Sequence, residues 1–399
     1  MELVAPAGNP EKLAFAWNYG ADAAYIGIKN FSLRSQADNF YEHEYLEIVK
    51  IKKNKKLYGA FNIFFHDHDI RRLEEEIEYI SRYAFDALIV SDLGIVPLLR
   101  RNFPQTPLHL STQANCLNAE SAKYYRDLGF SRIIAAREAS LGEIEQIKKK
   151  AGLETEIFVH GAMCLAYSGR CFLSAYMADR SANSGNCSHS CRWQYRVLEE
   201  SERPGEYFPV EENGNFTTVM SSHDLCMIDY IKEIENAGVD AVKIEGRMKS
   251  AYYTAVTVRA YRAALDRSAD FPFWKLELDN VSHRPFSTGF YFGREQIQKP
   301  AEQSYIQNYV FIGTVTGQAE KNLYNVKLKN RFASGDTVEF LFFGGLMQPA
   351  DFEILDENKN PADVLHPGKI CFIRINAPLP ENTIIRKKNN NSQNPAFNS

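Results

Sequence analysis

The sequence has 399 residues, of which 45% are hydrophobic and 24% are charged, a composition typical of globular proteins. This length exceeds the roughly 250 to 300 residues at which a single core stops growing, so we expect two domains. The net charge of −4 neither supports nor excludes a nucleic-acid partner, because the basic residues form only short local runs.

The sequence also bears on where the protein works. No run of about 18 apolar residues is present, so no transmembrane helix is predicted. The first residues, MELVAPAGNPEKL, lack the cationic stretch and apolar run of a secretory signal. We therefore expect a cytoplasmic protein without membrane association, in a compartment that keeps thiols reduced.

The first 265 residues alternate short apolar runs with amphipathic helical patterns, which predicts a parallel sheet. Eight such runs within about 250 residues fit a closed (β/α)8 barrel of the TIM type. A doubly wound open sheet is the alternative, but no G-x-G-x-x-G motif follows the first run. The eight predicted strands are residues 3–7, 23–28, 57–64, 87–92, 108–113, 132–136, 156–161 and 241–246.

Between the seventh and eighth predicted strands, residues 162–222 interrupt the barrel pattern. This insertion carries most of the cysteines and a further strand-like run, residues 216–222. An ordinary connection has about 2 to 6 residues, so an insertion of this length is expected to be functional. It follows the C-terminal end of a strand, which is the end where barrel enzymes place their active sites.

The chain after the barrel changes character. Residues 266–305 are irregular, aromatic and proline-containing, and we expect them to form a connecting segment. Residues 306–388 contain short strand-like runs separated by Gly, Asp, Asn and Pro, which predict a small antiparallel β-barrel or sandwich. The polar tail, residues 389–399, is low in complexity and is expected to be disordered.

Five of the seven cysteines fall in one window, and in a reducing compartment this clustering favours metal binding over disulfides. Four thiolates can hold an iron–sulfur cluster or a structural zinc ion. Their spacing leaves a cluster, zinc and the absence of a metal all open. The five are Cys164, Cys171, Cys187, Cys191 and Cys226. The isolated Cys116 and Cys371 are expected to be small buried hydrophobic residues.

Polar side chains follow several of the predicted strands, and at one rim of a barrel they would converge on one pocket. Taken singly, each could instead be a helix cap or a turn residue, so the predicted site depends on the set. The set is Asn62, His66, Ser91, Asp92, Ser111, Gln113, Arg137, Glu138, His160, Glu245 and Arg247. Arg137, Arg247 and the inserted Arg170 are candidate anion or phosphate contacts, with a salt bridge inside the chain as the alternative.

Several long segments resemble the signature of peptidase family U32, in the same order along the chain. They are LVAPAGNPEKL (3–13), STQANCLN (111–118), EIFVHGAMCLAYSGRCFLS (156–174), SGNCSHSCRWQY (184–195), SSHDLCMID (221–229), VDAVKIEGRMKS (239–250) and PFSTGFYFG (285–293). The resemblance covers essentially the whole barrel. The following β domain resembles the C-terminal domain of that family.

The resemblance implies a cofactor, because hydroxylation proteins of this family carry a 4Fe–4S cluster. Cys164, Cys171 and Cys187 match cluster ligands. Relatives suggest both Cys226 and Cys191 as the fourth ligand, and Cys226 is preferred because Cys191 lies only four residues from Cys187. The cluster would handle electrons or bind the hydroxyl donor.

The chain is most similar to the branch of the family that hydroxylates tRNA. This implies conversion of the wobble uridine to 5-hydroxyuridine, with prephenate as the hydroxyl donor and tRNA as partner. An unpaired base in an anticodon loop can be splayed into a pocket and stacked on an aromatic or arginine side chain. The catalytic residues would then be His160, Glu245 and Arg247, and the substrate-binding residues Arg137, Arg170, Asn62 and Gln113.

Three other functions remain open. The family name implies a peptidase, and some members have been called collagenases, but the sequence contains no H-E-x-x-H, G-x-S-x-G or P-loop motif. Other members hydroxylate ribosomal RNA or ubiquinone precursors. The last alternative is a non-catalytic RNA-binding module in which a metal only stabilises the insertion.

Overall fold

The computed structural model describes residues 1–33, 39–41, 43–164, 166–192, 211–213, 216–218, 223–293, 305–349 and 351–389. The chain divides into two compact units. The first comprises Met1–Lys275 and His283–Tyr305, and the second comprises Leu276–Ser282 and Ile306–Ser399. Within the described residues, no helix combines the length and the apolar composition that crossing a membrane requires.

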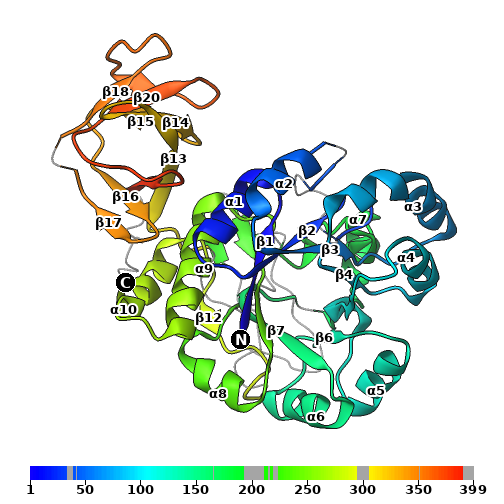
Figure 1. Ribbon diagram of the computed structural model, residues 1–399. Helices are drawn as coiled ribbons and strands as arrows, with labels where there is room; N and C mark the ends of the chain where they lie inside the picture. Colours follow the sequence, from blue (N-terminus) through cyan, green and yellow to red (C-terminus); the bar gives the residue numbers. More distant parts are fainter. Residues whose placement is uncertain are drawn as a thin grey trace. The chain divides into compact units, whose positions relative to one another are not determined.

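The first unit is a closed barrel of eight parallel strands, which confirms the predicted fold (Figure 1). Each predicted strand is present, and β11 pairs in parallel with both β1 and β7, which closes the ring. The strands are β1 (Glu2–Ala7), β2 (Ala23–Gly27), β3 (Lys56–Phe61), β4 (Ala87–Val90), β5 (Leu108–Leu110), β6 (Arg132–Ile134), β7 (Glu154–Ala162) and β11 (Ala241–Ile244).

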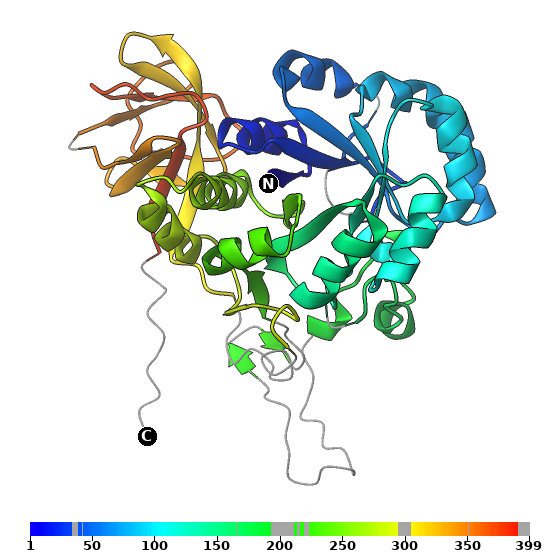
Figure 2. The same cartoon turned by 60° about the horizontal axis from the view of Figure 1, so that its bottom comes forward.

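Helices surround this barrel on the outside, as the turned view shows (Figure 2). They are α1 (Pro10–Asn18), α2 (Tyr45–Lys52), α3 (Asp67–Ile80), α4 (Val96–Asn102), α5 (Ala119–Asp127), α6 (Leu141–Ala151), α8 (Ile231–Asn236) and α9 (Ala251–Asp266). Several begin at a side chain that accepts a hydrogen bond from the first turn. Asn9 accepts from the Lys12 amide at 2.9 Å, and Ser140 forms a capping box with Glu143.

The burial of the strands explains why they read as continuous apolar runs. All five residues of β2 are buried, because a parallel strand is covered on one face by helices and on the other by the barrel interior. Helix α9 is buried along most of its length and packs on α1 and β1. A helix that is apolar on nearly all sides belongs to the interior.

Two short strands extend the barrel sheet beyond β7. β10 (Asp224–Cys226) pairs antiparallel with the end of β7, and β12 (Phe286–Ser287) pairs in parallel with β10. The segment expected to connect the domains therefore contributes a strand to the barrel sheet, and it also contains α10 (Phe271–Glu277). In the insertion, α7 (Leu173–Ala178), β8 (Glu211–Asn213) and β9 (Phe216–Thr218) are described, and the rest of the predicted run 216–222 lies outside the described residues.

The second unit is an antiparallel β domain, as predicted. Its main sheet has the order β17-β16-β21-β13-β14-β20-β18, and β15 pairs with β19. The strands are β13 (Tyr309–Glu320), β14 (Leu323–Leu328), β15 (Phe332–Ala333), β16 (Val338–Phe342), β17 (Gly345–Met347), β18 (Glu353–Leu355), β19 (Val364–Leu365), β20 (Cys371–Arg374) and β21 (Ile384–Lys388). The predicted disordered tail lies outside the described residues except for Asn389.

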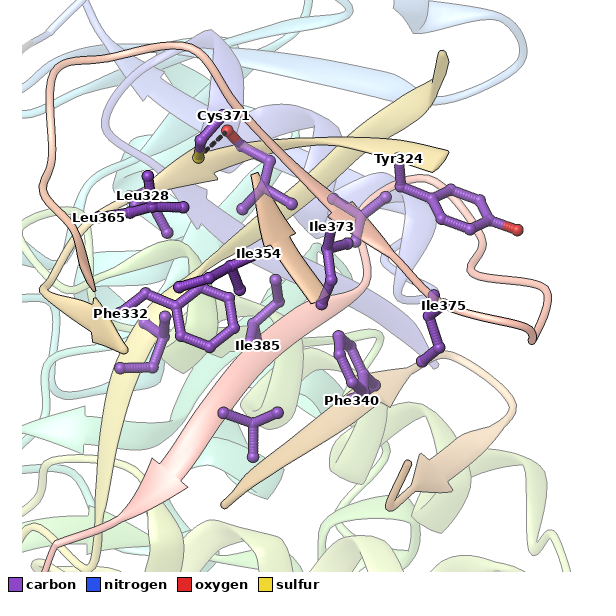
Figure 3. Close-up of a cluster of buried hydrophobic side chains, with 14 of the residues drawn as sticks. Tyr324, Leu328, Phe332, Phe340, Ile354, Leu365, Cys371, Ile373, Ile375 and Ile385 are labelled. Carbon is purple, nitrogen blue, oxygen red and sulfur yellow. Dashed lines mark hydrogen bonds between the residues drawn. The ribbon is translucent and has the colours of Figure 1, made fainter. Parts of the chain in front are cut away.

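Apolar side chains from these strands form a large core (Figure 3), and Leu323, Leu355 and Phe372 form a smaller separate cluster. Phe332, Phe340 and Ile373 are each at most 1% exposed. Cys371 belongs to this core and its thiol donates a hydrogen bond to the Val326 carbonyl at 3.2 Å. Cys116 is likewise buried in the barrel unit, so both isolated cysteines are the small buried residues that the sequence predicts.

Candidate active site at the barrel mouth

A pocket lies at the C-terminal ends of the barrel strands. Its polar lining residues follow β3, β5 and β6, or lie in and just after β11, which is where a barrel enzyme gathers its site. The polar lining residues are Asn62, Ser111, Thr112, Gln113, Arg137, Lys243, Glu245 and Arg247. Six of the eleven strand-end residues singled out in the sequence therefore line the pocket, and His66, Ser91, Asp92, Glu138 and His160 do not.

The pocket is rich in cationic groups. Arg137 donates a hydrogen bond to the Ala162 carbonyl and lies over the Phe158 ring, 4.2 Å from its centroid. The guanidinium of Arg137 makes no ion pair with a described carboxylate, so it retains donors for a ligand. Arg247 donates to the Ser32 hydroxyl at 2.7 Å and to the Leu33 carbonyl, which fixes its orientation.

Two side-chain amides in the pocket also keep unused hydrogen-bonding groups. Asn62 accepts from the Leu33 amide through its oxygen at 3.0 Å, and its NH2 group bonds to no described residue. The side chain of Gln113 forms no hydrogen bond within the described chain. The enclosed volume is about 50 Å³, room for a few waters, so a larger ligand requires rim side chains to move.

Beneath the pocket, Lys243 belongs to a buried network of charges. Its ammonium lies 2.8 Å from Glu156 Oε1, and Arg132 contacts the other Glu156 oxygen at 2.9 Å. Arg132 also contacts Glu2 at 2.8 Å. Each carboxylate is thereby compensated, which a buried charge requires.

The electrostatics of this network follow from burial and pairing. Burial opposes ionisation of Glu156, yet the positive charges of Lys243 and Arg132 hold the pKa of its carboxyl below the usual range. Burial lowers the pKa of the Lys243 ammonium, and Glu156 acts against that shift. The pair is therefore held as an ammonium and a carboxylate by mutual contact.

His160 does not line the pocket. It is buried among the rings of Tyr253, Tyr261 and Phe286, with centroid distances of 5.4 to 5.9 Å. Burial lowers the pKa of His160 to about 3, so the imidazole is neutral at physiological pH. The predicted catalytic set is thus divided, with Glu245 and Arg247 in the pocket and His160 packed behind it.

The described part of the insertion crosses the same rim of the barrel. The Ser168 amide donates to Glu138, which follows β6, at 2.8 Å. Gly169 has a φ of +73°, and a Cβ there would lie 2.1 Å from the Gln113 carbonyl oxygen, so only glycine allows this close crossing. Arg170 is exposed on this segment and lies outside the pocket.

None of the five clustered cysteines is joined in a disulfide. Cys164 is exposed, and Cys171, Cys187, Cys191 and Cys226 are partly exposed. Within the part of the chain that the structure describes, no three or more His, Cys, Asp and Glu side chains are grouped to hold a metal ion. The donor chemistry suits an iron–sulfur cluster, because cysteine thiolates supply its ligands.

Comparison with known families decides the classification. The model of peptidase family U32 matches residues 8–300, and that of the peptidase family U32 C-terminal domain matches residues 307–386. The chain belongs to peptidase family U32. The pocket, the insertion and the small β domain all fall within the matched ranges of this U32 protein.

Full-length relatives of this U32 chain carry names that refer to tRNA. The tRNA hydroxylation protein P1 of Bacillus subtilis is 36% identical over 97% of this chain and 94% of its own length. The tRNA hydroxylation protein P of Escherichia coli is 34% identical over 92% of this chain and 91% of its own length.

Other relatives match a smaller part of the chain. An Escherichia coli protein named as a synthase of 5-hydroxycytidine in 23S ribosomal RNA is 34% identical over 67% of this chain and 39% of its own length. A Porphyromonas gingivalis protein named a collagenase is 31% identical over 73% of this chain and 74% of its own length. Names within the family therefore cover both RNA modification and proteolysis.

The sequence interpretation missed the charged network under the pocket of this U32 protein. Arg132, Glu156 and Lys243 each lie within a strand and are buried. A charged residue inside a buried apolar strand is itself a signal, because such residues are almost never fully buried unless paired.

Proposed function

We propose that this chain is an RNA-modifying hydroxylase whose substrate is tRNA. The observation that carries the proposal is the similarity over more than 90% of both chains to relatives named for tRNA hydroxylation. The relative named for ribosomal RNA shares only 39% of its own length with this chain, which favours tRNA over ribosomal RNA.

In its finer form, the proposal is that carbon five of the wobble uridine receives a hydroxyl group. This base is unpaired in the anticodon loop, so its presentation to a pocket costs little unstacking energy. Replacing the hydrogen at carbon five by hydroxyl is a net two-electron oxidation, so the compound that supplies the hydroxyl group must also accept two electrons. The donor proposed from the family resemblance is prephenate, a dicarboxylate.

The cationic side chains of the pocket suit such a donor. Arg137 retains guanidinium donors that no described carboxylate occupies, and Arg247 and Lys243 add positive charge beside it. Charge-assisted hydrogen bonds from arginine to a carboxylate are stronger than neutral ones and are often bidentate. We assign donor binding to Arg137, with Lys243 and Arg247 contributing to the local field.

The uracil edge has a complementary set of partners. The free NH2 group of Asn62 can donate to a uracil carbonyl oxygen, and the Gln113 amide can both donate and accept. Glu245 is the carboxylate among the lining residues, and we assign it the removal of the carbon-five proton. His160, which lies behind the pocket, is assigned no proton transfer.

A 4Fe–4S cluster is proposed as the cofactor. Cys164, Cys171 and Cys187 would hold it, with either Cys226 or Cys191 as the fourth ligand. When bound, the cluster would supply electron transfer or a Lewis-acidic iron. The Tyr261 hydroxyl lies 4.0 Å from the Cys226 sulfur, so it can donate a hydrogen bond that favours a thiolate there.

Proteolysis is the competing function, and the pocket gives it little support. No histidine or cysteine is among the described residues that line it, so the pocket lacks the imidazole base that activates a serine nucleophile. Purified protein should therefore not cleave gelatin above a matched control. Cleavage that persists through purification and is lost in the Ser111→Ala variant would favour the peptidase instead.

Mass spectrometry of nucleosides from a deletion strain tests the proposed substrate. Deletion of the gene, in a strain without a redundant paralogue, should remove the 5-hydroxyuridine-derived nucleosides of tRNA and leave ribosomal RNA unchanged. Loss of a hydroxylated cytidine from ribosomal RNA, with tRNA intact, would keep the chemistry and reject the substrate.

A further inference from the structure

Three aromatic side chains on the described part of the insertion are exposed to solvent. Tyr167, Phe172 and Tyr176 are 51%, 74% and 77% exposed, and the last two are the most exposed large hydrophobic side chains among the described residues. We call these three residues the aromatic shelf. Exposed aromatic groups of this size are costly in water and mark an interaction surface when they occur together.

The local backbone places two of these rings on the same side of α7. The Tyr176 amide donates to the Phe172 carbonyl at 3.0 Å, so the two residues stand one helical turn apart. Residues four apart on a helix are neighbours on its surface. Phe172 and Tyr176 therefore present adjacent rings to solvent from the start of α7.

Positive charge accompanies the rings. Arg170 and Arg180 flank Phe172 and Tyr176 in the chain, and neither guanidinium makes an ion pair with a described residue. Between residues 163 and 192 the sequence has three arginines and one acidic residue, Asp179. This local excess of positive charge contrasts with the net charge of −4 for the whole chain.

The segment that carries the shelf is fastened to the rim of the pocket. The chain at Gly169 passes close to the backbone of Gln113, and Gln113 lines the pocket. At the other end of the segment, the Asn183 carbonyl accepts a hydrogen bond from the Phe64 amide, which follows β3, at 3.0 Å. The shelf therefore belongs to the same face of the barrel unit as the candidate active site.

We infer that the aromatic shelf stacks the unpaired bases that neighbour the target nucleotide in an RNA loop, while Arg170 and Arg180 contact its phosphates. This inference rests on the proposed function and adds the element that holds the RNA. Aromatic rings interleaved with arginines that form no ion pair with a described residue suit single-stranded nucleic acid, because every base has a face that can stack and every nucleotide carries a phosphate.

The test is fluorescence anisotropy with a labelled RNA hairpin that has an unpaired loop, and with a fully paired RNA duplex. Phe172→Ala with Tyr176→Ala should weaken binding of the hairpin by about tenfold for each ring and leave duplex binding unchanged. Phe172→Tyr with Tyr176→Phe keeps both rings and should keep the affinity. Tyr124→Ala removes a tyrosine that is 61% exposed on α5 and is the matched control.

Salt dependence provides a second readout for the arginines. Arg170→Gln with Arg180→Gln should lower the slope of log affinity against log salt by about 0.7 for each single-strand phosphate that is no longer neutralised. Iron content and thermal unfolding are measured for every variant. If the double alanine variant loses its thermal transition, Tyr176→Ala alone gives the same comparison.

The outcomes separate this inference from the proposed function. Unchanged hairpin affinity in the alanine variants, with wild-type protein binding the hairpin, would overturn the shelf and leave the proposed function standing. If the alanine variants lose binding to a protein partner and keep their affinity for RNA, the inference is also overturned, because the aromatic shelf would then be a protein-binding surface. Wild-type protein that binds neither RNA would overturn both.

Discussion

The ammonium nitrogen of Lys243 lies 2.8 Å from a carboxylate oxygen of Glu156, and both side chains are almost fully buried inside the barrel. Arg132 contacts the second oxygen of Glu156, so this carboxylate is compensated from two sides. Because Lys243 also lines the pocket, the pair links the stability of the barrel interior to the charge of the candidate active site.

Removing one partner of this buried pair should destabilise the barrel strongly. Glu156→Gln leaves the ammonium of Lys243 without its carboxylate, and we expect the free energy of unfolding to fall by about 3 to 5 kcal/mol. Glu154→Gln is the matched control, because Glu154 contacts the same Arg132 but is 53% exposed, and its loss should cost less than about 1 kcal/mol. Equal losses in urea denaturation would contradict this account of the pair.

Buried neutral histidine should make the protein sensitive to acid. The pKa of His160 is lowered from 6.5 to about 3, so between these values the unfolded chain binds a proton that the folded chain does not. Its contribution to stability is therefore present above pH 6.5 and is lost as the pH falls towards 3. His160→Gln should flatten the dependence of unfolding free energy on pH by up to about 1.4 kcal/mol per pH unit in this window.

The control for this experiment is His68→Gln, which changes an exposed histidine on α3 and should follow the wild-type curve. If His160 were the general acid or base of the reaction, His160→Gln would in addition abolish turnover by the folded protein. That result would return His160 to the catalytic set.

The barrel could be predicted because its strands are short, apolar and regularly spaced. All eight are predictable, since each is largely buried and most are followed by a turn and a helical pattern. The additional strands β10 and β12 have three and two residues, too few for a periodic signal. Their positions are decided by tertiary pairing with β7.

The site was predictable only where chemistry coincides with a strand end. Asn62, Gln113, Arg137, Glu245 and Arg247 were found on that rule and line the pocket. His160 satisfies the same rule, but its side chain points into an aromatic cluster, and strand position alone cannot distinguish the two directions. Pairing across strands, as between Lys243 and Glu156, is a property of three-dimensional contact and requires the fold.

Substitution of different cysteines should change the iron content of the protein to different extents. Anaerobically purified protein should contain about four irons per chain, and Cys187→Ala should remove them. Comparison of Cys191→Ala with Cys226→Ala identifies the fourth ligand, because only substitution of a true ligand should lower the iron content. Cys116→Ala, which changes a buried cysteine outside the insertion, is the control and should retain iron. Colourless protein with stoichiometric zinc would contradict the cluster.

The second unit has its own buried ion pair, and its loss should unfold that unit first. Arg386 lies between Glu277 and Glu339, 2.8 Å from the latter, and all three side chains are buried. Arg386→Met leaves two carboxylates buried together and should cost about 3 to 5 kcal/mol. Arg374→Met removes a half-exposed arginine of the same sheet and should cost under about 1 kcal/mol. Calorimetry that shows no difference between them would contradict this assignment.

Substitution of a pocket residue should lower the rate of product formation and leave the stability of the fold unchanged. Arg137→Met removes the guanidinium that we assign to the donor, while its methylenes can still pack on Phe158. We expect turnover to fall by at least tenfold, the loss of about 1.5 to 3 kcal/mol from one charge-assisted hydrogen bond. Thermal unfolding should be near that of wild type, and a matching loss of stability would make Arg137 a structural residue.

The central claim is tested most directly by complementation of a deletion strain, with tRNA nucleosides measured by mass spectrometry. The wild-type gene should restore 5-hydroxyuridine and its derivatives, while Cys187→Ala and Arg137→Met, expressed at equal levels, should not. The Tyr124→Ala gene should restore them like wild type. Restoration by the Cys187→Ala and Arg137→Met genes at the wild-type level, or tRNA nucleosides that never change on deletion, would contradict the proposal that this chain is a tRNA hydroxylase.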